Sequence, residues 1–183
     1  IYRANRLVNW CCKLQTALSD VECETEDIEP FTKISIPNHK YPAEFGAMWK
    51  FAYPVKDSDE KVIIATTRPE TMLGDVAVAV HPDDPRYKHL HGKELVHPFI
   101  PDRKMKVITD AELVDMNTGT GCVKITPAHD PNDYKCGKKH NLEFINIFTD
   151  DGRLNENAGP YAVMNRDKIV NLNHILGYAQ IRL

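Results

Sequence analysis

Short apolar segments separated by polar ones run along most of the chain and predict a protein rich in β-strands. In 47–55 every second residue is apolar, which is the period of a half-buried strand. Shorter segments at 61–66, 75–80, 121–126 and 143–148 hold valine, isoleucine or phenylalanine in close succession. Each of these segments predicts a further strand.

Helices are expected at three places. The segment 67–74 begins with a threonine N-cap candidate, has an early proline and a glutamate, and closes on glycine, which predicts one or two helical turns. The aspartate and proline at 130–131 signal the start of a helix that runs to about His140. In 166–176 apolar residues recur at helical spacing, and Gly177 is the expected C-cap.

The other segments favour loops and turns. The stretch 22–40 is polar and holds two prolines, so it is expected to form loop or edge structure. The Asp-Asp-Gly sequence at 150–152 predicts a tight turn. Many short strands with few short helices favour a mixed α/β fold with a curved or closed sheet. The order lacks the regular strand–helix alternation of a doubly wound fold.

The composition fits one domain. The chain has 183 residues, of which 42% are apolar, enough for a real core, and it lacks the run of about 18 apolar residues that spans a membrane. Five cysteines without regular spacing or a CxxC pair favour a reducing compartment over a disulfide framework or a structural zinc site. The chain starts at Ile1 without a signal-peptide pattern, so we expect both ends to be cuts from a longer protein.

Charge and motif content narrow the class of ligand. The net charge of −3 disfavours a large nucleic-acid footprint, because phosphate contacts need lysine and arginine. It still permits a site for one nucleotide end that other parts of a larger protein deliver. The chain has no P-loop and no GxGxxG, and the His-Ile-Leu-Gly sequence at 174–177 lies within a predicted helix. We therefore expect no ATP site.

A first cluster of polar residues follows the predicted strand 61–66. It consists of two threonines, an arginine, a proline, a glutamate and a third threonine at 66–71. Hydroxyls and the free backbone N–H groups of a helix start would meet there, which suits a carbonyl or nucleotide oxygen. The alternative is an ordinary capping motif beside a surface arginine.

A second cluster, 124–134, follows the predicted strand 121–126. Asp130 and Asp133 lie three residues apart, so one can cap the predicted helix while the other faces a cleft and binds an ammonium group. The alternatives are a plain N-cap at Asp130 and a solvated carboxylate at Asp133. With His129, the two aspartates also form a fragment of a metal site, although no further ligand follows at a fixed spacing.

Two long segments, Ala65–Pro82 and Gly119–Tyr134, enclose these clusters. The first closely resembles the threonine-rich motif of the editing insertion of valyl-tRNA synthetases, and the second resembles the second motif of that insertion. Glu70 followed by Leu-Gly-Asp at 73–75 is similar to the valyl form rather than to the isoleucyl or leucyl form. The segments 6–11 and 19–22 resemble the junction into the insertion, so the resemblance covers nearly the whole chain.

The resemblance implies a fold and an activity. The fold would be a mixed β-barrel flanked by short helices, forming one editing domain over 1–183 with 1–23 and 166–183 near the junctions to a catalytic core. Valine and threonine have almost the same volume, and an apolar pocket cannot strongly reject an added hydroxyl. A second site would therefore hydrolyse threonine esterified to tRNA(Val), with threonyl-adenylate as a further candidate substrate.

Residue roles are also implied by the resemblance. Asp133 would anchor the substrate α-ammonium, and Thr66 and Thr67 would stand beside it at the reacting ester. A positioned water would attack without a covalent intermediate, metal or cofactor, since no Ser-His-Asp or Cys-His arrangement is evident. Further substrate-binding residues are expected at Arg68, Thr71, Lys124, Thr126, His129 and Asp130.

The implied partners are the 3′ end of tRNA(Val) carrying threonine and the remainder of the synthetase. We expect a cytoplasmic protein without membrane contact and a monomeric isolated domain. Two other classes stay open. One is a metal-dependent hydrolase that uses His129, Asp130 and Asp133, and the other is a non-catalytic insert that only orients tRNA.

Overall fold

The structure is a computed structural model that describes residues 1, 6–24, 26–35 and 41–162. The helix predicted at 166–176, its cap at Gly177 and the segment 174–177 lie outside the described residues. Strands dominate the described part, with one α-helix and four 3-10 helices. In chain order the elements are β1 (Asn9–Cys11), β2 (Thr16–Leu18), η1 (Asp20–Glu22), β3 (Thr32–Ile34), β4 (Ala43–Phe45), β5 (Trp49–Pro54), β6 (Lys61–Thr66), η2 (Pro69–Gly74), β7 (Ala77–Val80), η3 (Lys88–Leu90), β8 (Glu94–Val96), β9 (Lys104–Thr109), β10 (Cys122–Ile125), α1 (Pro131–Lys139) and η4 (Glu156–Tyr161).

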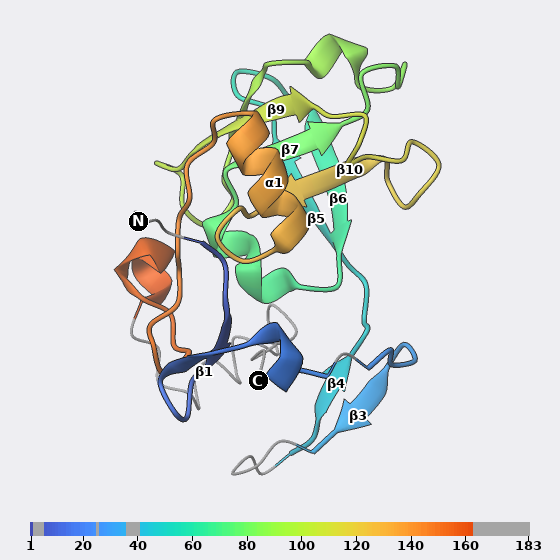
Figure 1. The fold of residues 1–183 in the computed structure, drawn as a ribbon. Coiled ribbons are helices and arrows are strands. Elements are labelled where there is room, and N and C mark those ends of the chain that lie inside the picture. The colour runs from blue at the N-terminus through green and yellow to red at the C-terminus, as the bar shows by residue number, and fades with distance from the viewer. Residues whose placement is uncertain (2–5, 25, 36–40, 163–183) are drawn as a thin grey trace.

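The central sheet has four strands in the order β10-β7-β9-β8 (Figure 1). Strand β7 pairs antiparallel with β10 and parallel with β9, and β8 pairs antiparallel with β9. All four residues of β7 are buried, as expected for a strand covered on both faces. Ala77 and Ala79 pack toward Cys136 of α1, whereas Val78 and Val80 pack toward the β5–β6 hairpin.

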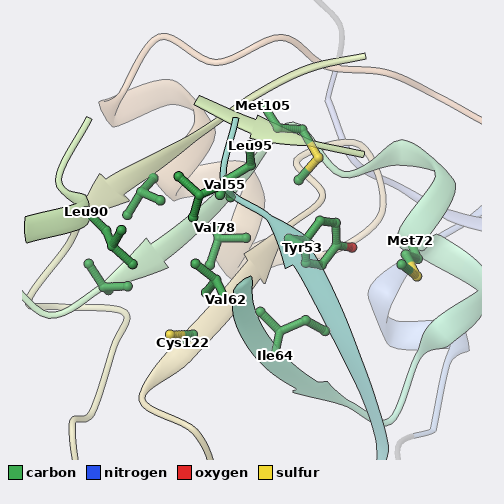
Figure 2. Packing of buried hydrophobic residues seen from close by; sticks show 12 residues of the cluster. Tyr53, Val55, Val62, Ile64, Met72, Val78, Leu90, Leu95, Met105 and Cys122 are labelled. Atoms are coloured by element: carbon green, nitrogen blue, oxygen red, sulfur yellow. The ribbon is translucent and has the colours of Figure 1, made fainter. Parts of the chain in front are cut away.

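Strands β5 and β6 form a separate antiparallel hairpin, which packs against the face of this sheet opposite to α1. At one edge β6 lies beside β10, and at the other an isolated bridge joins Val55 to Leu95 of β8. Among the described strands no continuous ladder closes this arrangement, so the predicted barrel-like sheet is curved and mixed rather than closed. Figure 2 shows the side chains that fill the space, with Tyr53, Val62 and Ile64 of the hairpin facing Val78.

Most of the predicted strands are confirmed. The segment 47–55 contains β5, 61–66 coincides with β6, and 75–80 and 121–126 contain β7 and β10. The helix signalled at 130–131 is α1. Its N-cap, Asp130, accepts hydrogen bonds from the N–H groups of Asn132 and Asp133, which is the geometry expected of an aspartate cap.

The strand predicted at 143–148 is wrong. Ile145 and Ile147 are buried, so the alternation of apolar residues does report packing against Leu73 and Val76. The backbone forms only an isolated antiparallel bridge there, between Phe148 and Leu154, and the Ile147 N–H donates to the Nε2 atom of His129 instead of to a strand. The tight turn predicted at 150–152 is present, and its Gly152 N–H donates to the carbonyl of Thr149.

The strands β1–β2 and β3–β4 form two small antiparallel ribbons away from the central sheet (Figure 1). None of the described residues in these four strands is fully buried. None of the five cysteines, which all lie in the described ranges, forms a disulfide. No helix in the described ranges is long and apolar enough to cross a membrane.

Close packing fixes α1 against the loop that follows β10. A Cβ atom added at Gly137 would lie 2.8 Å from the Cβ and Cγ atoms of Pro127, closer than real contacts allow. Gly137→Ala is therefore expected to lower the free energy of unfolding by about 1–3 kcal/mol, measured by urea denaturation. Lys135→Ala, on the exposed side of α1, is the matched control. An unchanged midpoint for Gly137→Ala would show that this contact yields easily.

Candidate functional site

The two polar clusters predicted from the sequence meet in space. The first connects β6 to η2, and the second connects β10 to α1, and β6 lies beside β10. Arg68 of the first cluster donates from Nη1 to the backbone carbonyl of His129 in the second, at 2.7 Å. Its Nη1 atom also lies 3.8 Å from Oδ2 of Asp130. Arg68 thus fastens the two clusters to each other.

Lys124 lies at the centre of a buried polar network. Its Nζ atom donates to the hydroxyls of Thr71 and Thr126, at 2.7 and 2.5 Å, and to Oδ1 of Asp75 at 3.1 Å. These three bonds use all three N–H groups of the ammonium. The sequence predicted roles for Lys124, Thr71 and Thr126, but not for Asp75.

Asp75 and Tyr53 belong to this network, and neither was predicted from the sequence. The Asp75 carboxylate is fully buried and accepts from the hydroxyls of Tyr53, at 2.6 Å, and Thr126, at 2.5 Å, as well as from Lys124. Burial and the negative charge of Asp75 raise the pKa of the Tyr53 phenol well above its usual value. The one available signal was an aspartate directly before an apolar run that forms a fully buried strand.

Asp133 projects from the first turn of α1 into the same region. It is only 7% exposed, so the solvated-carboxylate alternative is wrong. Its Oδ2 atom accepts from the backbone N–H of Thr126 at 2.8 Å. Burial raises the pKa of Asp133 to about 6, although the Lys124 ammonium opposes this shift. A carboxylate held this way gains from a cation that arrives with a ligand.

Glu70 is a second buried carboxylate without a predicted role. Its Oε1 atom accepts from Nε of Arg68 at 3.3 Å, while Oε2 is buried and lacks a hydrogen-bond partner. Burial raises the pKa of Glu70 to about 6 against the opposing charges of Arg68 and Lys124. With Asp75, Asp130 and Asp133, four carboxylates surround two cationic side chains, so the site carries an excess of negative charge when all are ionised.

The threonines of the first cluster divide into distinct positions. Thr66 accepts the backbone N–H of Arg68 at 3.0 Å, and Thr71 donates to the Arg68 carbonyl at 3.0 Å. Thr67 is exposed. The predicted threonine cap of this helix is wrong, because Arg68 occupies the N-cap position of η2 without a side-chain cap. The proline that follows lacks an N–H, so one fewer donor needs a cap.

His129 supports the fold locally. Its Nε2 atom accepts from the Ile147 N–H at 3.1 Å, and burial, aided by the charges of Arg68 and Lys124, lowers its pKa to about 4. The ring is therefore neutral near pH 7. Its lone pair is occupied, which counts against the metal site of His129, Asp130 and Asp133. Among the described residues, the group of potential ligands that does converge is Asp110, Cys136 and His140, where Lys139 also lies 3.2 Å from Asp110.

A cavity of about 1090 Å³ adjoins the site. Arg68 and His129 form its inner wall, and the segment 6–10 forms another wall. Besides Asp20 and Asp150, the residues that line it include several with aromatic or cationic side chains. They include Arg6, Trp10, Tyr134, Lys138, Phe144 and Phe148.

Comparison with known proteins defines the class. The family model of the leucyl-tRNA synthetase editing domain matches residues 89–180, which include β9, β10, α1 and the second polar cluster. The chain therefore belongs to the editing-domain family of aminoacyl-tRNA synthetases. Among solved structures, a leucyl-tRNA synthetase of Agrobacterium radiobacter K84 aligns with 69% of this chain and 19% of its own at 16% identity, with a TM-score of 0.48.

Sequence relatives define the particular member. The mitochondrial valine–tRNA ligase of Saccharomyces cerevisiae is 66% identical over 87% of this chain and 14% of its own length. The valine–tRNA ligase of Schizosaccharomyces pombe is 63% identical over 91% and 17%, and the human enzyme is 54% identical over 84% and 12%. The chain corresponds to the editing domain of valyl-tRNA synthetases and spans less than a fifth of the length of these relatives.

Proposed function

We propose that this domain hydrolyses threonyl-tRNA(Val), and threonyl-adenylate as a second substrate, within a valine–tRNA ligase. The observation that carries the proposal is the buried Asp133 carboxylate, which lies in a site with more carboxylates than cations. The α-ammonium of an aminoacyl ester supplies the missing positive charge. A charge-assisted hydrogen bond from that ammonium to Asp133 would hold the ester in place.

The proposed reaction is direct attack by water. The water oxygen adds to the ester carbonyl, the bond to the ribose oxygen breaks, and that oxygen leaves with a proton to give free threonine. Burial raises the pKa of the thiols of Cys122 and Cys136, that of Cys136 to about 11, so neither is an activated nucleophile. The site would accelerate the reaction by positioning the ester and the water. Backbone N–H groups or hydroxyls near Thr66 and Thr67 would donate hydrogen bonds to the developing oxyanion.

The adjoining cavity suits the end of a tRNA. The rings of Trp10, Tyr134 and Phe148 offer surfaces on which unpaired bases can stack, and Arg6 and Lys138 supply charge for the phosphates. The net charge of −3 leaves little to hold the rest of the tRNA. We infer that the remainder of the synthetase supplies that contact. Monomeric state and cytoplasmic location stay predictions.

Comparing the domain alone with the full synthetase tests the proposal. The full enzyme is expected to deacylate threonyl-tRNA(Val) and to spare valyl-tRNA(Val). This chain alone is expected to act weakly or not at all at low concentration, because it lacks the contacts to the tRNA body. A full enzyme that leaves threonyl-tRNA(Val) intact would contradict the proposed function, and it would favour an insert that only orients tRNA. Rapid deacylation by the chain alone would show that the tRNA-body contacts are dispensable.

A further inference from the structure

Asp75 connects the elements that carry the site. It lies between η2 and β7, and its carboxylate binds side chains from β5 and β10 and the loop beyond β10. The two oxygens have different partners. Oδ2 accepts from Tyr53, whereas Oδ1 accepts from both Lys124 and Thr126. A fully buried carboxylate with three side-chain donors has little freedom to move, so it can act as a fixed reference for the groups it binds.

The second link runs from Thr126 to Asp133. The Thr126 hydroxyl donates to Asp75 and accepts from Lys124, which fixes the side chain from two directions. The backbone N–H of the same residue donates to Asp133 at 2.8 Å. Thr126 is itself fully buried. The position of the Asp133 carboxylate therefore depends on Thr126, and the position of Thr126 depends on Asp75.

We propose that Asp75 is a positioning residue of the editing site, which acts through Thr126 to hold Asp133 where it meets the substrate ammonium. This inference rests on the proposed function. Asp75 itself has no solvent exposure and does not need to touch the substrate. Displacing a reacting group by about 1 Å can cost about 100-fold in rate, so a residue one step removed can control the reaction strongly.

A double-mutant cycle on the deacylation of threonyl-tRNA(Val) by the full synthetase tests this inference. Asp75→Asn and Thr126→Val are each expected to lower kcat/KM about 10- to 100-fold. The kcat/KM of the double variant is expected to be no lower than that of the less active single variant, because both changes break the same chain of contacts. Asp84→Asn is the matched control. Asp84 is also buried and ion-paired, with Arg86 at 2.6 Å, but it lies beyond the other end of β7.

Three outcomes would overturn the inference: wild-type deacylation by Asp75→Asn, losses that multiply in the double variant, or an equal loss in Asp84→Asn. If Asp75→Asn does not fold, the pair Thr126→Val and Thr126→Ser decides. Thr126→Ser keeps the hydroxyl and is expected to recover most of the activity that Thr126→Val loses, and equal activities would refute the chain of contacts. Failure of the proposed function is distinguishable, because the wild-type synthetase would then leave the ester intact.

Discussion

Asp133→Asn in the full synthetase is expected to abolish the clearing of threonyl-tRNA(Val) while valine activation stays intact. The amide is neutral, so the substrate ammonium would enter a buried site without its partner. Breaking one side of a buried charge pair costs about 3–5 kcal/mol, which is roughly 150- to 5000-fold in kcat/KM for deacylation. The measurement is the accumulation of threonyl-tRNA(Val) during aminoacylation with threonine.

The same substitution is expected to stabilise the fold. Burial raises the pKa of Asp133 from 3.8 to about 6, so the folded state holds a proton that the unfolded state has lost over this interval. The free energy of unfolding that depends on Asp133 is therefore highest below pH 4. It falls as pH rises through 6, by up to about 3 kcal/mol in total. Asparagine does not titrate. The variant should therefore unfold at higher urea than the wild type at pH 7.5, and this advantage should disappear near pH 4.

These two readouts separate a functional carboxylate from a structural one. If Asp133 had only a structural role, its substitution would make the protein less stable, and the loss of editing would then follow from local unfolding. Lys135→Ala, on the same helix but exposed, should change neither readout. Unchanged editing by Asp133→Asn would remove Asp133 from the site. A less stable variant at pH 7.5 would contradict the role of burial in raising its pKa.

Local patterns predicted those elements in which the periodicity of the side chains matches the hydrogen bonding of the backbone. In β6 the exposed and buried positions alternate over Lys61–Ile64, and α1 begins at an aspartate that caps it and a proline that suits its first turn. In 143–148 the periodicity of the side chains and the hydrogen bonding of the backbone disagree. Apolar residues there alternate because two isoleucines fill a core, but the backbone forms only an isolated bridge at Phe148, and the Ile147 N–H donates to the His129 ring. Periodicity detects burial, not the identity of the hydrogen-bond partner.

The candidate site was predictable only in part for a similar reason. Its two clusters stand out in the sequence because polar side chains gather at strand ends. Tyr53 and Asp75 do not stand out, since each sits within or beside an apolar pattern, 22 residues apart. Only the packing of β5 against the start of β7 makes their contact, and only that contact shows why a carboxylate is tolerated in the core. Strands β8 and β9, with lysines at alternate positions of β9, were also missed.

Selectivity for threonine over valine is expected to arise from hydrogen-bond acceptors that only a hydroxyl can satisfy. All three donors of Lys124 are occupied within the protein, and the hydroxyl protons of Thr71 and Thr126 are directed to Arg68 and Asp75. The network can therefore accept further hydrogen bonds but has few donors left. We expect the substrate hydroxyl to bind it as a donor, while the methyl group of valine at that position leaves an acceptor unpaired.

Titration calorimetry of this chain with three non-hydrolysable aminoacyl-adenosine analogues measures the effect. An unpaired buried acceptor costs roughly 1–3 kcal/mol, which is about 5- to 150-fold in affinity, so the valyl analogue should bind at least about tenfold more weakly than the threonyl one. The seryl analogue keeps the hydroxyl and lacks one methyl group, worth about 0.8 kcal/mol or roughly fourfold. The expected order is threonyl, seryl, valyl. Equal affinities, or a valyl analogue that binds better than the seryl one, would show that shape or tRNA delivery sets the selectivity instead.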